Sequence, residues 1–477
     1  MHTQLLVLGG GPGGYAAAFL AADAGMDVTL VEQNARLGGT CLLQGCIPSK
    51  ALLHVAHTIS ELARLRADGW GVDYADIEIQ LDKLRARTEK LVATLSGGLG
   101  QLAKRRHVKV IAAHGQFADS TTIVLHGEDD SIPPDGRITF DHAVIATGSR
   151  PVLPAALKVD SPRVWTSGRA LELSRVPESL LVVGGGYIGL ELGTVYARLG
   201  SRVSVVELTD GLLPGVDRDL VRPLARRLDA LLEKRIALGT RVARLVDVDH
   251  GVQAELEGPD GGRTERFDAV LIAVGRQPVT TGFGLEHTAV ALDTHGFLAC
   301  DSRQFTTDKR ILAVGDVAGQ PMLAHKATHQ AKIAVAALTR KQADSRVAAV
   351  PAVVFTDPEL AWVGLTEQTA HAESIEFKTA VYPWAASGRA HSMGRPDGLT
   401  KWLFDPETKR LLGCGIVGVG AGELIGEAAL ALETGCDVAT LGNTIHPHPT
   451  LSETLTNAAD VAFGTAIEIY KPLRKRG

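Results

Sequence analysis

Two glycine-rich turns restrict the fold of this chain more than any other feature of its sequence. The first, at 9–14, reads Gly-Gly-Gly-Pro-Gly-Gly and follows an apolar run at 4–8 that is expected to be a strand. A helix is expected at 15–24 and a second strand at 28–32, ending in Glu32. Glycines at G-x-G-x-x-G spacing let a pyrophosphate approach the helix N-terminus, and the acid can accept hydrogen bonds from ribose hydroxyls. The pattern predicts a dinucleotide-binding unit, with a purely structural strand–helix turn as the alternative.

The same arrangement returns in the middle of the chain. A strand at 180–183 leads into a glycine turn at 184–189, a helix to about residue 199 and a strand at 203–207 that ends in Glu207. Two such units are more specific than one, and they predict two dinucleotides that exchange electrons. The Glu207 carboxylate would accept from a ribose 2′-hydroxyl and repel a 2′-phosphate, so NAD is expected rather than NADP.

Composition limits the class of protein. The 477 residues correspond to roughly three domains. Apolar residues make up 45% and charged residues 22%, as in ordinary globular proteins, and the net charge of −5 gives no reason to expect nucleic acid or a membrane surface as partner. No signal peptide or transmembrane segment is recognised. Five cysteines in so long a chain indicate a reducing, cytoplasmic compartment with one catalytic pair. The basic run at 474–476 is expected to be a solvated tail.

Cys41 and Cys46 follow closely on the first glycine turn. In a regular helix, α-carbons five residues apart are separated by about 8.6 Å, whereas a disulfide needs less than about 7 Å. If the two cysteines pair, the turn between them must be distorted, and Gly45 and Pro48 suit such a turn. Taken alone, the two residues fit either buried small hydrophobes or an accessible dithiol for thiol exchange. The other three cysteines show no metal-ligand spacing and are expected to be structural thiols: Cys300, Cys414 and Cys436.

A histidine-rich segment lies near the C-terminus. His446 and His448 each precede a proline, which disfavours helical backbone. Thr450 and Glu453 have the spacing of a capping box, which predicts a helix after Thr450. The alternative is that Glu453 orients His448 as an acid–base group, for which the near-neutral pKa of histidine is suited. His446 is expected to be a supporting or packing residue.

The order of these motifs resembles the pyridine nucleotide–disulfide oxidoreductases, and among them most closely the dihydrolipoamide dehydrogenases. The resemblance rests on the two glycine turns, on Cys41, Cys46, Pro48 and Lys50, and on the final His-Pro-Thr-x-x-Glu segment. Three positions depart from the usual residues of that family: Leu43, Gln44 and Val279. The resemblance implies FAD in the first unit, NAD in the second and no metal site.

It also implies a set of cofactor-binding residues, which lie in the two glycine turns and in the segments expected to surround them. These are Gly9, Gly11, Gly14, Glu32, Gly39, Thr40, Lys50, Gly115, Thr147, Gly148, Gly184, Gly186, Gly189, Glu191, Glu207, Val242, Gly275, Asp316 and Ala324.

The implied reaction is oxidation of dihydrolipoamide with reduction of NAD. Cys41 and Cys46 would form a redox-active disulfide, with Cys41 facing the substrate and Cys46 facing the flavin. In the resembled family the catalytic histidine comes from the other subunit, so His448 and Glu453 imply a homodimer. The lipoyl group is expected on a separate lipoylated protein, such as a 2-oxo acid dehydrogenase complex or the glycine cleavage system.

The predicted fold is α/β, with two Rossmann-like domains and a C-terminal α+β dimerisation domain whose antiparallel sheet has one covered face. The expected boundaries are 1–150 and 279–347 for a discontinuous FAD-binding domain, 151–278 for the NAD-binding domain and 348–477 for the dimerisation domain. Two other functions stay open: a related flavin disulfide reductase with another substrate, and a non-catalytic flavin-bound scaffold. Some of those reductases prefer NADP, and Glu207 disfavours NADP. A scaffold would need neither the two cysteines nor the histidine.

Overall fold

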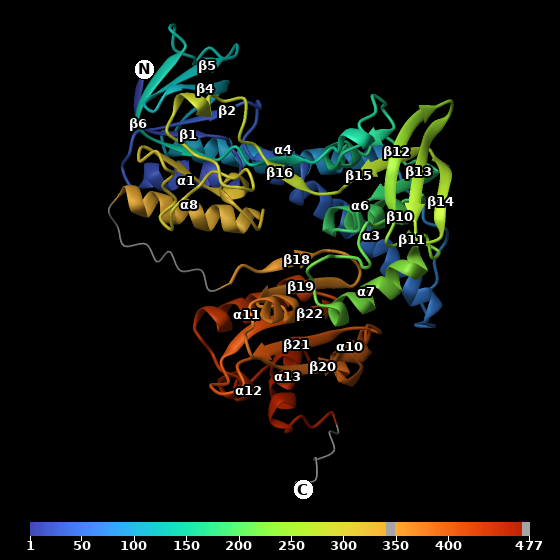
Figure 1. Cartoon of the computed structure of the whole chain (residues 1–477). Coiled ribbons are helices and arrows are strands. Elements are labelled where there is room, and N and C mark those ends of the chain that lie inside the picture. The colour runs from blue at the N-terminus through green and yellow to red at the C-terminus, as the bar shows by residue number, and fades with distance from the viewer. Residues whose placement is uncertain (340–348, 470–477) are drawn as a thin grey trace.

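The computed structural model describes residues 1–339 and 349–469, which form three units of sheet and helix (Figure 1). The predicted α/β class with a C-terminal α+β unit is confirmed. The expected boundary between residues 347 and 348 and the basic run at 474–476 lie outside the described residues. In the described part of the chain, no helix is long and apolar enough to cross a bilayer.

The first unit is a seven-stranded sheet built around β1 (His2–Leu8). β1 pairs in parallel with β2 (Val28–Glu32) and β6 (Arg137–Ile145), and β6 also pairs with β17 (Ile311–Ala313). The chain thus returns to the first sheet after it has formed the second unit. β2 and β17 are buried throughout, and β1 is buried and apolar from Leu5 to Leu8, as expected for parallel strands covered on both faces. The remaining strands are β3 (Lys109–Ala112), β4 (His114–Asp119) and β5 (Thr122–His126).

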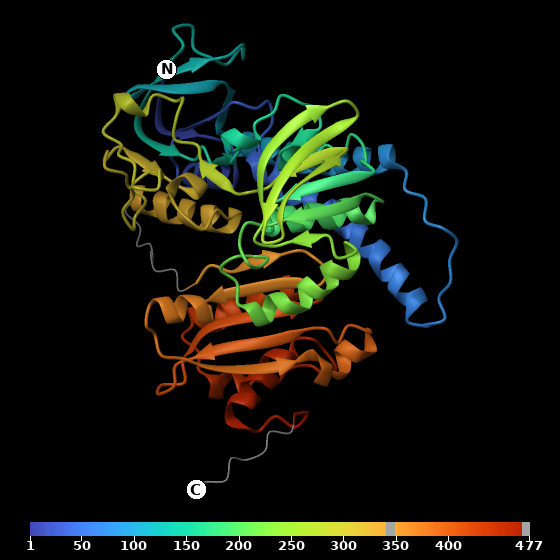
Figure 2. The ribbon, with the colours of Figure 1, turned by 45° about the vertical axis from the view of Figure 1, so that its right-hand side comes forward.

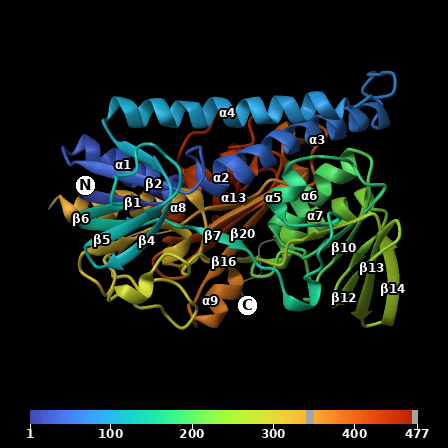
Figure 3. The ribbon, with the colours of Figure 1, turned by 90° about the horizontal axis from the view of Figure 1, so that it is seen from above.

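Helices cover this sheet and extend beyond it. α1 (Pro12–Asp23) packs beside α8 (Ala324–Leu338) on one face. α1 starts three residues before the expected position because proline is tolerated in the first turn of a helix. α3 (Cys46–Ala67) and α4 (Leu81–Arg105) run from the first unit towards the second (Figure 3), where α3 packs on α6 (Tyr187–Arg198).

The second unit repeats the parallel arrangement around β9 (Ser179–Val183). Helices pack on one face of its sheet, and a three-stranded antiparallel meander packs on the other. The sequence did not predict the meander, whose last strand, GGRTERF, is largely polar. The strands of the sheet and meander are β8 (Val164–Trp165), β10 (Arg202–Val206), β11 (Ile236–Ala237), β12 (Arg241–Val248), β13 (Gly251–Gly258), β14 (Gly261–Phe267) and β15 (Ala269–Ile272); two further helices are α5 (Ser167–Leu171) and α7 (Arg218–Leu231).

The third unit is an antiparallel sheet in the order β18-β19-β22-β21-β20. Its elements are β18 (Ala352–Val354), β19 (Glu359–Gly364), α9 (Glu367–Ala372), β20 (Lys378–Pro383), α10 (Gly388–Ser392), β21 (Leu399–Phe404), β22 (Leu411–Gly418), α11 (Ala421–Glu433), α12 (Val438–Gly442) and α13 (Glu453–Phe463). The antiparallel sheet is confirmed, although β20 was not predicted.

The expectation of a single covered face on this sheet is wrong. α11 and α13 cover one face, and α7 of the second unit packs against β19 and β22 on the other (Figure 2). A Cβ added to Gly415 of β22 would lie 2.3 Å from a methyl carbon of Leu220 on α7. The second face is therefore buried against another unit, which the sequence of the sheet alone does not reveal.

Candidate active site

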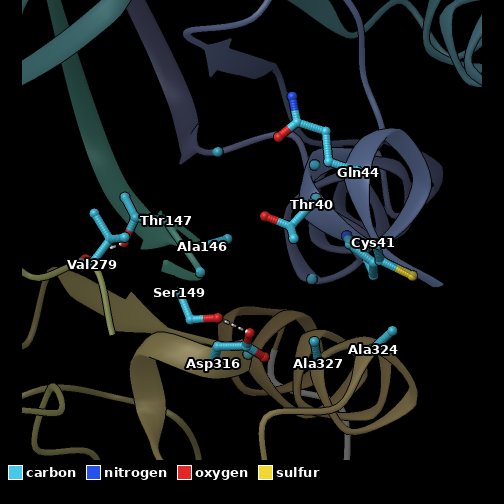
Figure 4. A pocket seen from close by; sticks show the side chains of 18 of the residues that line it. Thr40, Cys41, Gln44, Ala146, Thr147, Ser149, Val279, Asp316, Ala324 and Ala327 are labelled. Carbon is cyan, nitrogen blue, oxygen red and sulfur yellow. Dashed lines mark hydrogen bonds between the residues drawn. The ribbon is translucent and has the colours of Figure 1, made fainter. Parts of the chain in front are cut away.

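A cavity of about 350 Å³ opens beside the first glycine turn and is lined by both Cys41 and Cys46. Figure 4 shows Cys41 together with other residues of the lining. Twelve of the predicted cofactor residues line it: Gly9, Gly11, Glu32, Gly39, Thr40, Lys50, Gly115, Thr147, Gly148, Glu191, Asp316 and Ala324. The other predicted residues do not line this cavity: Gly14, Gly184, Gly186, Gly189, Glu207, Val242, Gly275, His448 and Glu453. The twelve predicted residues that line the cavity thus come from both halves of the first unit and, through Glu191, from α6 of the second unit.

The last glycine of each glycine turn serves helix packing. A Cβ at Gly14 would lie 1.8 Å from the carbonyl oxygen of Gly9, and a Cβ at Gly189 would lie 2.2 Å from that of Gly184. Each helix can therefore lie against its preceding strand only because the residue is glycine. Neither α1 nor α6 has a side-chain cap at its N-terminus, so their first amides are available to an anion such as a pyrophosphate.

The two strand-terminal acids occupy equivalent positions. Glu32 accepts a hydrogen bond from the backbone N–H of Gly10 at 2.5 Å, and Glu207 accepts one from Gly185 at 2.7 Å. Each carboxylate also accepts from the backbone N–H two residues further on. Both acids are thereby held against their glycine turns, where the remaining lone pairs suit ribose hydroxyls. The residues present fit a dinucleotide in each unit.

Cys41 and Cys46 lie on either side of a break between two helices. α2 (Gly39–Gln44) ends at Gly45, whose φ of −148° and ψ of −116° interrupt the helical path before α3 begins. A Cβ on residue 45 would lie 2.7 Å from the carbonyl oxygen of Thr40, so the backbone can fold back this closely only with glycine. The distortion expected between the cysteines is present, and Gly45 permits it.

The two thiols form a hydrogen-bonded pair of unequal acidity. The hydrogen bond with Cys41 lowers the pKa of Cys46 to about 7, aided by the ammonium group of Lys50 and opposed by burial. The same hydrogen bond and burial raise the pKa of Cys41. By contrast, burial raises the pKa of Cys300 to about 12 and that of Cys414 well above its ordinary value. Cys46 is therefore the thiol that ionises near neutral pH.

Lys50 joins the cysteine helix to the second and third units. Its Nζ lies 2.7 Å from Oε2 of Glu191 on α6 and 4.5 Å from the centre of the Phe355 ring. The other carboxylate oxygen of Glu191 accepts the backbone N–H of Phe355 at 2.9 Å. Glu191 is only 3% exposed, so its charge is compensated by these two partners inside the protein.

Asp316 enters the cavity from η3 (Gly315–Ala318), directly after β17. Its carboxylate accepts a hydrogen bond from the Ser149 hydroxyl at 2.5 Å (Figure 4). Nearby, the Thr147 hydroxyl donates to the backbone carbonyl of Val279 at 2.8 Å. Because this contact uses only the backbone of residue 279, the departure from the family's usual residue there leaves it intact.

His448 and Glu453 form a pair at the surface of the third unit. Nδ1 of His448 lies 2.8 Å from Oε1 of Glu453, while Oε2 of Glu453 accepts the backbone N–H of Thr450 at 2.7 Å. One of the two hydrogen bonds of the expected capping box, from the Thr450 N–H to Glu453, is therefore present together with the contact between His448 and Glu453. The Thr450 hydroxyl instead contacts Pro447 and Ser452, and α13 starts at Glu453, after Thr450 as expected.

His446 is more firmly held than a packing residue. Its side chain is 6% exposed, with Nε2 at 2.7 Å from a carboxylate oxygen of Glu427 on α11 and Nδ1 at 3.0 Å from the Thr444 carbonyl oxygen. The pair anchors the segment that carries His448, in agreement with the supporting role expected for His446.

Several side chains at the site were not among the predicted residues, and those with the most polar contacts include Ser149, Arg276 and Phe355. Ser149 and Arg276 each directly follow a predicted glycine, which is a usable sequence signal. Phe355 offers no such signal, because it meets Glu191 across 164 residues of chain.

Comparison with known proteins agrees with this geometry. A family model described as pyridine nucleotide-disulphide oxidoreductase matches residues 3–331, and the model of its dimerisation domain matches residues 350–459. The chain is 43% identical to the dihydrolipoyl dehydrogenase of Vibrio parahaemolyticus over 470 residues, which cover 98% of this chain and 97% of that protein.

Solved structures show the same fold. LpdA from Mycobacterium tuberculosis superimposes with a TM-score of 0.86 at 30% identity, covering 96% of this chain and 99% of that one. The HOCl-induced flavoprotein disulfide reductase RclA of Escherichia coli superimposes with a TM-score of 0.83 at 29% identity, covering 96% and 99%. The resemblance inferred from the motifs is confirmed: the chain belongs to the pyridine nucleotide-disulphide oxidoreductase family and carries its dimerisation domain.

Proposed function

We propose that this chain is a dihydrolipoyl dehydrogenase, which oxidises protein-bound dihydrolipoamide and reduces NAD by means of FAD. The observation that carries this proposal is the Cys41–Cys46 pair, which lines the cavity beside the first glycine turn and contains one acidified thiol. The 43% identity to a dihydrolipoyl dehydrogenase over nearly the whole chain supports the same substrate.

The two dinucleotides would occupy different units. Residues 1–150 and 279–347 form the FAD-binding domain, 151–278 the NAD-binding domain and 348–477 the dimerisation domain. FAD, when bound, supplies a redox group that can accept an electron pair from a dithiol and pass it on to NAD. Glu32 and Glu207 would hold the two riboses, and Asp316 would hold the flavin's ribityl chain.

The protein's own thiols carry out the exchange with the substrate. In the oxidised enzyme Cys41 and Cys46 share a disulfide. One thiolate of dihydrolipoamide attacks Cys41, forming a mixed disulfide, and Cys46 leaves as a thiolate. The second substrate thiolate then displaces Cys41, which releases the lipoamide disulfide and leaves both cysteines reduced. Two electrons move from substrate to enzyme, and the low pKa of Cys46 makes it the better leaving group.

His448 accepts a proton from the attacking thiol of dihydrolipoamide. Its imidazole is 79% exposed, Glu453 fixes one ring nitrogen, and neither residue lines the cavity of its own chain. An exposed acid–base group of this kind acts on the cysteines of a second copy, so the enzyme is a homodimer whose two sites each use both subunits. The substrate is carried by a lipoylated protein, and a reducing cytoplasm maintains the other cysteines as thiols.

The direct test is turnover of dihydrolipoamide by FAD-loaded protein with NAD or NADP. The wild type is expected to use NAD, whereas Cys46→Ser is expected to lose turnover; Cys436→Ser, remote from the cavity, is the matched control. Equal rates for the wild type and Cys46→Ser contradict the enzymatic function. Faster turnover with NADP contradicts the role of Glu207.

A second candidate is reduction of another disulfide, which the structural similarity to RclA favours. Glutathione disulfide and lipoylated proteins, assayed with both nicotinamides, separate the two. Preferred reduction of a non-lipoyl disulfide would replace the dihydrolipoamide assignment while leaving the thiol chemistry intact.

A further inference from the structure

Ser149 is a buried hydroxyl at the crossing between the first two units. It begins β7 (Ser149–Pro151), which pairs antiparallel with β16 (Arg276–Pro278), and it is 7% exposed. The proposed reaction uses no atom of Ser149. Its hydroxyl nevertheless forms hydrogen bonds with two side chains: Asp316 at 2.5 Å and Arg276 at 2.8 Å.

The chemistry of the partners sets the direction of both bonds. The guanidinium of Arg276 can only donate, so the Ser149 oxygen accepts from its Nε. An ionised Asp316 can only accept, so the Ser149 proton points at its Oδ2. The Ser149 hydroxyl has one proton. Because Arg276 cannot accept it, the hydroxyl donates this proton to Asp316.

Arg276 also prevents the serine from moving away. Its Nη2 donates to the backbone carbonyl of Ser149 at 2.7 Å, so the guanidinium binds the same residue through both hydroxyl and backbone. Two such bonds in the planar fork of arginine hold the serine more firmly than one.

The backbone of the Asp316 turn is held by a different residue. The buried ammonium of Lys326 on α8 donates to the carbonyl oxygens of Gly315, the first residue of η3, and Gly319, which follows its last residue. Loss of the Ser149 hydroxyl would therefore leave the turn in place and free only the Asp316 carboxylate to rotate.

We propose that Ser149 is a positioning residue, which aims the Asp316 carboxylate at the ribityl chain of FAD and joins it to Arg276 of the strand that leads out of the NAD-binding domain. The inference rests on the proposed function for the identity of FAD. It extends that function by naming a residue that determines how tightly the flavin is held.

The test measures FAD retained by holoenzyme after dilution and ultrafiltration. Ser149→Ala is expected to weaken FAD retention about tenfold, because a charge-assisted hydrogen bond is lost. Ser149→Thr, which retains the hydroxyl, is expected to stay within about twofold of the wild type. Ser179→Ala is the matched control, because the Ser179 hydroxyl donates to Asp268 at 2.7 Å, outside the cavity, and its loss is expected to leave FAD retention unchanged.

A double-mutant cycle assigns the effect to Asp316. In an Asp316→Asn background, Ser149→Ala is expected to change FAD retention less than twofold, because the charged acceptor is gone. A tenfold effect in both backgrounds overturns the proposal, as does wild-type retention by Ser149→Ala or failure of Ser149→Thr to restore it. Wild-type protein that binds FAD but does not oxidise dihydrolipoamide contradicts the proposed function without affecting this result, whereas wild-type protein that does not bind FAD contradicts both.

Discussion

The Nζ of Lys50 lies 2.7 Å from the buried carboxylate of Glu191, and this ion pair connects the cysteine helix to the first helix of the second nucleotide unit. The two charges act on Cys46 in opposite directions. Lys50 lowers the pKa of the Cys46 thiol, and Glu191 raises it. The pKa of the Cys46 thiol therefore depends on both members of the ion pair.

Neutralising Lys50 and neutralising Glu191 should shift the pKa of Cys46 in opposite directions. The thiolate is lost as pH falls through about 7, so Lys50→Met is expected to shift that loss to higher pH and Glu191→Gln to lower pH. The pH dependence of alkylation of the reduced enzyme measures both. Lys90→Met, on the exposed side of α4, serves as control; shifts of the same sign in both variants would contradict the assignment.

Gly45→Ala should damage the cysteine turn specifically. Its Cβ would meet the Thr40 carbonyl oxygen at 2.7 Å, so destabilisation by ~2 kcal/mol and slower closure of the Cys41–Cys46 disulfide are expected. Thermal unfolding and thiol titration during reoxidation measure the two effects. Gly97→Ala, which meets open space on α4, is the control and should be neutral or slightly stabilising. Unchanged reoxidation of Gly45→Ala would show that the break is not needed for pairing.

His448→Gln should separate the two halves of the reaction. Reduction of the enzyme by dihydrolipoamide is expected to slow by about 10²–10⁴-fold, because the proton acceptor is lost, while reoxidation by NAD remains near wild type. Stopped-flow flavin absorbance measures each half independently. His54→Gln, exposed on α3, is the control. Equal slowing of both halves would contradict the acid–base role.

The same variant tests whether the site is shared between subunits. Heterodimers of Cys41→Ser and His448→Gln subunits contain one intact site if each site takes its cysteines from one chain and its histidine from the other. Partial recovery of activity is expected on mixing, and no recovery in demonstrated heterodimers would contradict the shared site.

Lys401→Met should loosen the contact between the second and third units. The Lys401 side chain is 1% exposed, and its Nζ lies 2.7–2.8 Å from carboxylate oxygens of Asp217, Asp219 and Glu367. Burial acts to lower the pKa of Lys401, but the hydrogen bonds that its ammonium donates to the carboxylates outweigh burial and raise the pKa. The stabilisation is therefore complete at neutral pH and is lost only as pH rises beyond the ordinary range of lysine.

Removal of the ammonium leaves three carboxylates together without a cation. A loss of ~3–5 kcal/mol in the free energy of unfolding is expected, measurable by urea denaturation. Lys378→Met, exposed on β20, should change stability little. A similar loss in both variants would show that the cluster is not the cause.

The local features of this chain could be predicted from sequence because their causes are local. Each nucleotide unit combines a strand, a glycine turn, a helix and a terminal acid within about 30 residues, and the structure has all four elements in both. The break between Cys41 and Cys46 is likewise local: the two cysteines can pair only if the backbone between them bends, and Gly45 permits the bend. The β12–β14 meander and β20 were not predicted, since alternation in short, partly polar strands is a weak signal.

The assembly of the site was decided by tertiary structure. Lys50 meets Glu191 across 141 residues, and Glu191 meets Phe355 across 164, so no local pattern records either contact. Both contacts are needed because the Glu191 carboxylate is buried, and a carboxylate removed from water requires partners. These partners are supplied only when the three units pack together. The sequence by itself determined two dinucleotide folds, a dithiol and a histidine pair. The packed structure decided which charge lies beside which sulfur, because the strength of these interactions depends on distance and burial that residue order does not specify.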